Sequence, residues 1–337
     1  MRSFTNNEKL SFDEMLAIEK EIYAAESGCD NVVQETCHLL EVKSRPIIEF
    51  RDKEYNLPQN IFLLKGFGDV VLVGRKLRSI LHIENKINAI NCSMITADML
   101  LGVIDRYGKS KKDVWIKYHP FKKSEKRGLF NKIKINNKIE IIYPFLYKEY
   151  ETGLEEITPP EGWNIFPKRV TYLGYGEEHI RKYSVDVLSS YLNKAGTKVF
   201  DPACSTGEFL YTLKKVYPQI ITIGQDLSQA MVNYAKPYVD QIYCGDSIST
   251  PVEDGSVDVI VFRFLNSEVV SQEYAKELFD VLIKKMSDTG IAVLFGHTAV
   301  LLDLEYFTSS GCEVLQSSAY SKERDSIFQY YILRRKK

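Results

Sequence analysis

Three aspartates follow three short apolar runs in the second half of the chain, and their spacing is the feature that suggests chemistry. Asp201 ends the run 197–201, Asp226 follows the run 220–224, and Asp246 follows the run 241–244. The carboxyl ends of parallel strands meet at one edge of a sheet, so these carboxylates would lie close together. A carboxylate there can accept hydrogen bonds from the two hydroxyls of a ribose. The pattern predicts a nucleotide-binding site.

The turn after the first of these runs has small side chains. The sequence KVFDPACSTGEF places Ala203, Ser205 and Gly207 between Asp201 and a predicted helix over 208–216. Small residues let the backbone approach a ligand closely, and a serine just before a helix can cap its first turn. We therefore expect a strand, turn, helix and strand that form one βαβ unit. Ser205 either caps the helix, which is the interpretation we favour, or contacts the ligand through its hydroxyl.

The elements that must position these residues alternate regularly from about residue 165 onward. Helical spacing covers 184–192, 208–216, 229–236 and 272–286, and apolar strands cover 197–201, 220–224, 241–244, 257–262 and 291–295. Alternating strands and helices indicate a doubly wound α/β sheet. The last two runs, 313–320 and 327–333, have no helix between them and predict an antiparallel pair at the sheet edge.

Three acids in this order, with a closing hairpin, resemble the class I S-adenosylmethionine-dependent methyltransferase family. The resemblance implies a Rossmann-like α/β fold with a seven-stranded sheet, and S-adenosyl-L-methionine as the cofactor. It implies that the methionine end lies on the first turn, the ribose on Asp226 and the adenine beside Asp246. The residues expected to bind the cofactor are Tyr172, Tyr175, Asp201, Ala203, Ser205, Gly207, Asp226, Leu227, Met231, Asp246, Ser247 and Arg263.

The segment before the first strand, 163–183, is rich in aromatic residues. Tyr172 or Tyr175 could place a ring face against the cofactor's sulfonium cation, and Arg263 or Arg181 could pair with its carboxylate. The expected catalytic residues are Tyr175, Ser205 and His297, because His297 follows the fifth strand at the ligand-binding edge and a neutral imidazole accepts protons near neutral pH. His179 is a weaker candidate for the base.

The first half of the chain predicts an α+β accessory domain over residues 1–160, followed by the cofactor domain over 161–337. We expect a helix over 13–25, strands over 61–65 and 70–73, and a helix over 95–107. Residues 109–138 carry eleven Lys or Arg and two acids, interleaved with aromatic residues. Such a run can bind RNA, or it can be a solvated face beside a hairpin, which is the interpretation we favour.

Composition narrows the class of partner. The 337 residues carry 44 basic and 45 acidic side chains, so no global field favours nucleic acid or membrane. The six cysteines are scattered without paired spacing, which is typical of small core residues in a reducing compartment, and no metal site is expected. The polar start of the sequence is unlike a signal peptide, so we expect a cytoplasmic protein.

The sequence therefore predicts a methyltransferase that acts on a small-molecule acceptor, with residues 1–160 as a lid or a dimer surface. The Ser205 turn and the Gly174–Tyr175–Gly176 loop also resemble azetidine-2-carboxylate synthases, which cyclise the cofactor's aminocarboxypropyl arm and release methylthioadenosine. In that alternative, Ser205 with Asn136 or Asn137 would lie near the cofactor's amine. A second alternative is an RNA methyltransferase that binds through the basic run.

Overall fold

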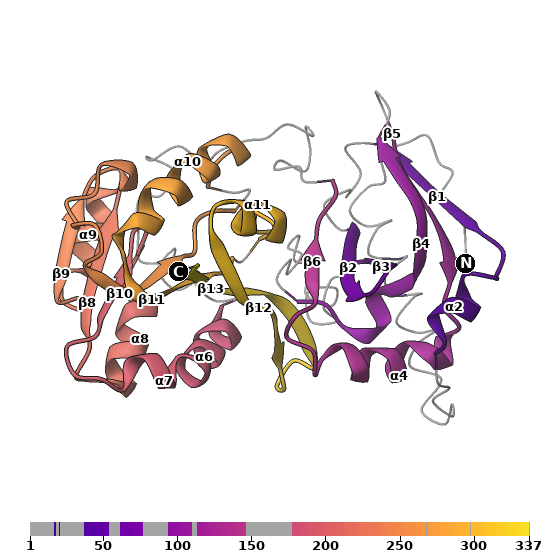
Figure 1. Ribbon diagram of the computed structural model, residues 1–337, viewed down its shortest axis with the longest axis horizontal. Coiled ribbons are helices and arrows are strands. Elements are labelled where there is room, and N and C mark those ends of the chain that lie inside the picture. The colour runs from indigo at the N-terminus through magenta and orange to yellow at the C-terminus, as the bar shows by residue number, and fades with distance from the viewer. Residues whose placement is uncertain are drawn as a thin grey trace. The chain divides into compact units, whose positions relative to one another are not determined.

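A computed structural model describes residues 17, 20, 37–53, 61–76, 94–109, 113–145, 177–266, 269–296 and 298–336. The chain divides into two units (Figure 1). The first comprises Met1–Glu155 with Asp325–Phe328, and the second comprises Glu156–Arg324 with Gln329–Lys337. None of the helices that the structure describes is long and apolar enough to cross a membrane.

The second unit holds the elements that position the three aspartates. Its described part contains a seven-stranded sheet with the order β12-β13-β11-β10-β7-β8-β9, which confirms the predicted α/β fold class. The strands are β7 (Lys198–Asp201), β8 (Ile221–Asp226), β9 (Gln241–Cys244), β10 (Val257–Phe262), β11 (Met286–Leu294), β12 (Cys312–Ser321) and β13 (Ser326–Arg335). The pairs among β7 to β11 are parallel, whereas β11 pairs with β13 in antiparallel register.

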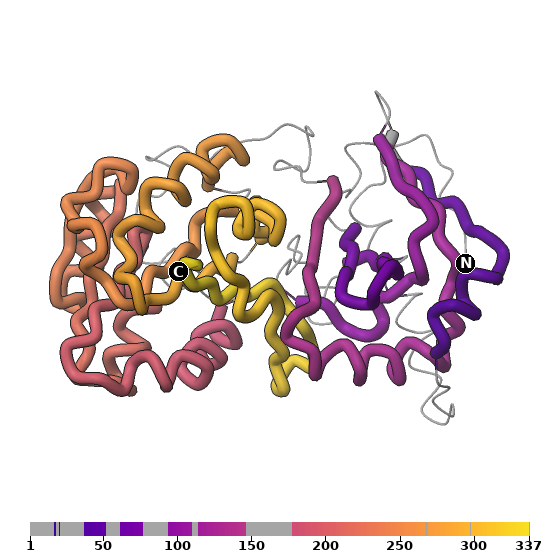
Figure 2. Tube along the Cα trace, viewed as in Figure 1, coloured from indigo at the N-terminus to yellow at the C-terminus, as the bar shows by residue number. Residues whose placement is uncertain are grey.

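The closing hairpin inserts its second strand into the sheet. β13 lies between β11 and β12, as the path of the chain in Figure 2 shows. The predicted antiparallel pair at the edge of the sheet is thus confirmed. A parallel strand that is covered on both faces reads as a continuous apolar run, which is the pattern of β10, where only Asp258 is not fully buried.

Helices cover both faces of this sheet. They are α6 (Glu178–Val187), α7 (Ser189–Leu192), α8 (Glu208–Val216), α9 (Gln229–Ala235), α10 (Gln272–Leu282) and α11 (Leu304–Ser309), with short 3-10 turns η4 (Ser247–Ser249) and η5 (Ile283–Lys285). Figure 1 shows α6, α7 and α8 on one side and α10 on the other. The predicted helix 272–286 is too long, because Met286 already pairs with Val257 at the start of β11.

The first unit contains an antiparallel sheet with the order β1-β5-β4-β3-β2-β6. Its strands are β1 (Ile48–Lys53), β2 (Ile61–Phe67), β3 (Val70–Arg75), β4 (Leu100–Lys109), β5 (Asp113–Pro120) and β6 (Glu140–Ile142). The helices are α2 (Leu39–Val42) and α4 (Lys123–Ile133), with the turn η2 (Ala97–Met99). One face buries an apolar cluster that includes Leu63, Val73, Ile116 and Tyr118.

One expectation for the first unit is wrong. Residues 95–107 were expected to be helical, but most of them form β4 between β3 and β5. This segment pairs with a strand on each side, and Gly102 permits the close approach of β5, because an added Cβ there would clash with the carbonyl oxygen of His119. Within the basic run 109–138, α4 continues to Ile133 and a turn follows. Nearly all of the predicted helix 13–25 lies outside the described residues.

Candidate active site

The structure brings the three aspartates to one edge of the second sheet. Asp201 and Asp226 are the last residues of β7 and β8, and Asp246 follows β9 by two residues. These strands are parallel neighbours, so their carboxyl ends share an edge. This edge is where open α/β sheets bind their ligands. The arrangement is the one that the sequence pattern indicated.

The turn after β7 folds tightly around Asp201. The Asp201 Oδ1 atom accepts the backbone N–H of Ala203 at 3.1 Å. Ser205 and Gly207 both have positive φ, at 52° and 74°. Glycine adopts this conformation without strain, and an added Cβ at Gly207 would lie 3.0 Å from Val239 Cγ2. The turn therefore keeps its backbone exposed to the sheet edge through small residues.

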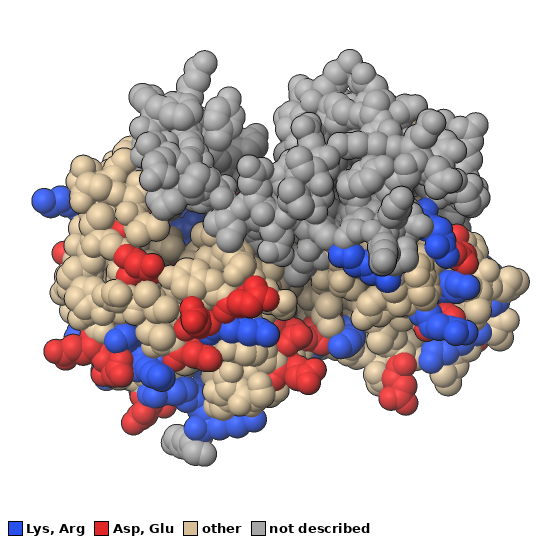
Figure 3. All heavy atoms as spheres, turned by 90° about the horizontal axis from the view of Figure 1, so that it is seen from above, with Lys and Arg blue, Asp and Glu red and all other residues tan. Residues whose placement is uncertain are grey.

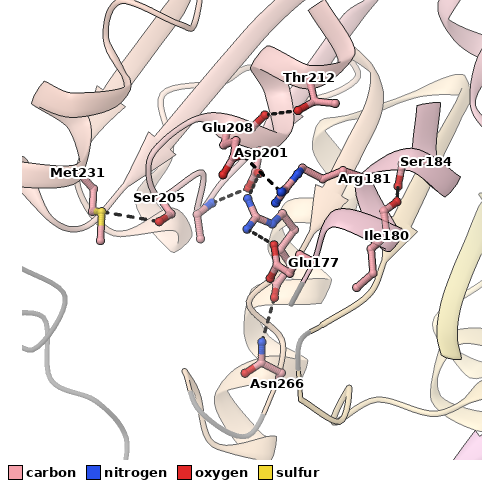
Figure 4. Close-up of polar contacts among 12 residues, drawn as sticks. Glu177, Ile180, Arg181, Ser184, Asp201, Ser205, Glu208, Thr212, Met231 and Asn266 are labelled. Carbon is pink, nitrogen blue, oxygen red and sulfur yellow. Dashed lines mark hydrogen bonds and ion pairs between the residues drawn. The ribbon is translucent and has the colours of Figure 1, made fainter. Parts of the chain in front are cut away.

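The role expected for Ser205 as a helix cap is wrong. Gly207 is the N-cap of α8, and no side chain caps that helix. The Ser205 hydroxyl instead donates to the sulfur of Met231 at 3.6 Å, as Figure 4 shows. With φ at 52°, the serine side chain projects toward α9 and away from the start of α8. Met231 itself is buried, whereas Leu227 is 53% exposed.

Asp226 is held by two backbone donors. Its Oδ2 atom accepts the N–H of Ser205 at 2.8 Å, and its Oδ1 atom accepts the N–H of Ser228 at 2.9 Å. Burial raises the pKa of Asp226, and the two hydrogen bonds partly oppose that shift. A carboxylate has about four acceptor positions, so two remain for other donors. The site thus fixes the carboxylate and leaves it able to accept ribose hydroxyls.

Asp246 lies in a more open environment. The hydroxyl of Tyr274 on α10 donates to both of its oxygens, at 3.0 and 2.9 Å, and Oδ1 also accepts the N–H of Ile248. Burial and the hydrogen bond to Asp246 raise the pKa of Tyr274 to about 12. Behind the loop, Gln225 donates to the carbonyls of Gly245 and Asp246. Ser247 donates to the carbonyl of Pro202, which ties the third turn to the first.

A buried group of charges occupies the end of the site near β7. Arg263, just after β10, donates through Nη2 to Glu177 Oε2 at 2.8 Å, and its Nη1 atom lies 3.6 Å from Asp201 Oδ2. Burial raises the pKa of Asp201 to about 6, against the opposing charge of Arg263. Burial acts against the guanidinium charge too, but the carboxylates of Glu177 and Asp201 outweigh it and raise the pKa of Arg263.

Two buried polar atoms in this group have no hydrogen-bond partner among the described residues: Asp201 Oδ2, an acceptor, and Arg263 Nε, a donor. Such atoms are costly to bury unless a partner reaches them. An α-amino acid group offers both partners, because its ammonium donates and its carboxylate accepts. The residues present therefore fit the methionine end of S-adenosylmethionine.

Other predicted residues lie around this group or outside the described chain. Arg181 pairs with Glu208 at 3.3 Å, and Lys182 and Glu178 form an exposed pair on α6. His179 is buried within α6. Tyr172, Tyr175 and His297 fall outside the described residues, so their roles stay predictions. Asn136 and Asn137 belong to the first unit, where Asn136 accepts the N–H of Lys138.

Sequence reasoning missed three residues that complete the site: Glu177, Gln225 and Tyr274. Gln225 had a signal, because it precedes Asp226 in a strand that is otherwise apolar. Glu177 and Tyr274 contact partners 86 and 28 residues away. Nothing local in the sequence marks such contacts.

Comparison with known proteins agrees with the site. Residues 199–290 match a family model described as "Methyltransferase domain". The chain is 33% identical to isonocardicin synthase from Nocardia uniformis subsp. tsuyamanensis over 282 residues, which cover 82% of this chain and 92% of that protein.

Solved structures with similarity to this chain include two methyltransferases. A sugar N-methyltransferase from Streptoalloteichus sp. is 13% identical, with a TM-score of 0.40 over 51% of this chain and 94% of that one. A SAM-dependent methyltransferase from Leishmania major is 15% identical, with a TM-score of 0.42 over 52% of this chain and 81% of that one.

The relative from Nocardia and the methyltransferase domain match carry the assignment, and they agree with the sheet order and with the buried partners for an amino acid group. The cofactor is S-adenosylmethionine, and the protein is a transferase enzyme. The chain belongs to the class I S-adenosylmethionine-dependent methyltransferase superfamily and, within it, to the family that includes isonocardicin synthase.

Proposed function

We propose that this enzyme transfers the methyl group of S-adenosylmethionine to a small-molecule acceptor. The observation that supports the proposal is the buried pair of atoms, Asp201 Oδ2 and Arg263 Nε, that have no hydrogen-bond partner among the described residues. The carboxylates of Asp226 and Asp246 lie at the same edge of the sheet. When bound, the cofactor supplies a carbon that the acceptor's lone pair attacks while the bonding electrons leave to sulfur. Catalysis then depends mainly on positioning and on the exclusion of water.

The residues of this chain have separable tasks in that proposal. Asp201 and Arg263 bind the amino acid group. Asp226 accepts hydrogen bonds from the ribose hydroxyls, and Asp246 accepts a hydrogen bond from the amino group of adenine. Three anchors along one sheet edge leave the sulfonium end no freedom to turn, which is the condition for in-line attack. Residues 1–160 would form a separate accessory domain.

Two observations favour a small acceptor over RNA. The relative is named for the synthesis of one compound, isonocardicin, and its match is longer than the second unit, so it includes part of the first. The basic run is also partly neutralised: Lys117 pairs with Glu49 at 3.2 Å, and both Arg127 and Lys134 pair with Asp325. Acidic and basic side chains are interspersed over the described part of the face in Figure 3.

A second candidate is cyclisation of the cofactor's aminocarboxypropyl arm, as in azetidine-2-carboxylate synthases. It requires a base that takes a proton from the ammonium before the amine attacks the γ-carbon. Asp201 Oδ2 has no hydrogen-bond partner among the described residues, and burial raises the pKa of this carboxyl to about 6, so it is better suited to this task than an ordinary carboxylate. The products would be the cyclic amino acid, methylthioadenosine and a proton.

Calorimetric titration with S-adenosylmethionine and S-adenosylhomocysteine tests the cofactor site, and absence of binding to both would overturn it. The reaction is then tested with cofactor labelled either in the methyl group or in the aminocarboxypropyl arm. Each form is incubated alone, with a low-molecular-weight cell extract, or with total RNA. Methyl label in the small-molecule fraction supports the proposal.

The other outcomes exclude methyl transfer to a small acceptor. Methylthioadenosine formed from the cofactor alone identifies cyclisation. Arm label in the extract, with methylthioadenosine released only when extract is present, identifies transfer of the arm to an acceptor. Methyl label in RNA alone identifies an RNA methyltransferase.

A further inference from the structure

Arg263 lies between two carboxylates and makes a hydrogen bond to one of them. Its Nη2 atom is 2.8 Å from Glu177 Oε2, which is hydrogen-bonding distance, whereas its Nη1 atom is 3.6 Å from Asp201 Oδ2. The side chains are enclosed, with exposed fractions of 14% for Arg263, 13% for Glu177 and 0% for Asp201. One guanidinium and two carboxylates carry a net charge of −1. The group therefore lacks one positive charge.

The backbone fixes both ends of the Arg263–Glu177 contact. The carbonyl of Glu177 accepts the N–H groups of Ile180 and Arg181, each at 2.9 Å, in the first turn of α6. The carbonyl of Arg263 accepts the side-chain N–H of Asn266 at 2.9 Å. The guanidinium also lies 5.6 Å from the centre of the Phe209 ring, within the range of a cation–π contact. Arg263 is held at three places, and among the described residues only Glu177 restrains its charged end with a hydrogen bond.

Without Glu177, the guanidinium would turn to Asp201. A charge-assisted hydrogen bond between Arg and a carboxylate forms at about 2.7–2.9 Å, and the present separation of 3.6 Å needs only a small rotation to close. In a buried environment that contact would be strong. It would occupy the one Asp201 oxygen that has no hydrogen-bond partner among the described residues.

We propose that Glu177 is a positioning residue for the cofactor: it holds Arg263 away from Asp201, so that Asp201 Oδ2 can accept the ammonium while Arg263 Nε remains for the carboxylate. The proposal rests on S-adenosylmethionine as the cofactor and is independent of which of its groups is transferred. Glu177 need not touch the cofactor for this role.

The test compares Glu177→Gln with Glu178→Gln. Glu178 is the neighbouring acid, 63% exposed and paired only on the surface with Lys182 among the described residues, so it controls for the loss of one negative charge. Affinity is measured for S-adenosylmethionine and for methylthioadenosine, which lacks the amino acid group. E177Q should weaken the affinity for S-adenosylmethionine about tenfold or more and change the affinity for methylthioadenosine less than about twofold. E178Q should change neither.

A pH profile separates positioning from a general structural role. In E177Q the loss of the Glu177 charge and the approach of the guanidinium both stabilise the charged form of Asp201, so the pH below which S-adenosylmethionine binding weakens should fall by about one unit. Equal weakening of both ligands, an unchanged affinity for S-adenosylmethionine, or an unshifted profile would each overturn the proposal. If the wild type bound no S-adenosylmethionine at all, the cofactor assignment would fail instead.

Unfolding curves establish whether E177Q is folded. If it is not, the wild type supplies the test, because it should bind S-adenosylhomocysteine at least about tenfold more tightly than the analogue without its α-amino group. Equal affinities would show that Asp201 is not kept available to the ammonium, and the proposal would be overturned.

Discussion

The two ends of the cofactor site differ in the burial of their carboxylates and in the hydrogen bonds that these carboxylates already accept. At the end of β7, Asp201 is fully buried among charges, and one of its oxygens has no hydrogen-bond partner among the described residues. Beyond β9, Asp246 is exposed to solvent and already receives hydrogen bonds from Tyr274 and Ile248. A buried charge without its full set of partners binds a complementary charge strongly, whereas an exposed carboxylate exchanges one donor for another at little gain. We therefore expect the methionine end to contribute most of the free energy of cofactor binding and the adenine end to contribute a smaller part.

The largest expected effect comes from removal of the buried charge. Asp201→Asn should weaken S-adenosylmethionine by about 100-fold or more, because a buried charged hydrogen bond is lost, and should leave methylthioadenosine nearly unchanged. The matched control is Asp303→Asn, which alters a solvated helix cap of α11. Calorimetric titration measures all three proteins. A similar loss for both ligands in D201N would mean that the two ends do not differ as described.

A smaller effect should follow from pH. The Asp201 carboxyl has a pKa of about 6 in the folded protein, against 3.8 ordinarily, so it takes up a proton as the pH falls through about 6. The protonated acid cannot bind an ammonium as a charge, and S-adenosylmethionine affinity should fall about tenfold between about pH 7 and pH 5. Because the pKa of Asp226 is also raised, the ratio of the affinities for S-adenosylmethionine and methylthioadenosine isolates Asp201. A ratio that is independent of pH would contradict the assignment.

The same proton has the opposite effect on folding. The folded protein binds it more tightly than the unfolded chain does, so the free energy of unfolding contributed by Asp201 increases as pH falls through about 6 and levels off only below the ordinary pKa of 3.8. The difference in unfolding free energy between wild type and D201N should therefore shift in favour of the wild type at lower pH. Denaturant titrations at several pH values measure it, and a shift toward D201N would show that the pKa is not raised.

At the adenine end, Tyr274→Phe should have a modest effect that is equal for both ligands. It removes a partly exposed hydrogen bond that orients Asp246, which corresponds to about a threefold loss in affinity. Tyr306→Phe is a control on the neighbouring helix α11. A loss of affinity for S-adenosylmethionine alone would place Tyr274 near the methionine end and contradict the difference between the two ends.

The smallest effect is expected at Ser205. Its hydroxyl contacts the sulfur of Met231 and its backbone N–H binds Asp226, so Ser205→Ala removes only the weaker of the two contacts. Affinity for S-adenosylmethionine and turnover should stay within about twofold of wild type. A loss of turnover of tenfold or more, with unchanged affinity, would restore Ser205 to the catalytic role that the sequence suggested.

Sequence reasoning succeeded where local pattern determines structure. The bounds of α8, β9 and β10 agree with the predicted ranges, because apolar periodicity and flanking turn residues fix them. Asp201, Asp226 and Asp246 were found for the same reason, since each closes an apolar strand. These features depend on residues that are close together in the chain.

Reasoning from sequence failed where contacts between distant segments decide. The strand β4 was predicted to be a helix because its own residues do not reveal its partners. The close approach of His119 to Gly102, for example, joins two different strands. Likewise, the contact of Glu177 with Arg263 joins residues that are far apart in the sequence. That Asp201 Oδ2 has no hydrogen-bond partner among the described residues is known only once its neighbours are in place. The sequence therefore predicted where the site lies, but it did not predict which buried charges pair with one another there.

The crystal structure of the complex with S-adenosylhomocysteine tests the central claim most directly. We expect the α-amino nitrogen within about 3 Å of Asp201 Oδ2, with Arg263 still hydrogen-bonded to Glu177 and its Nε directed to the carboxylate. An α-amino nitrogen bound elsewhere, or an Arg263 that has left Glu177 for Asp201, would contradict the account.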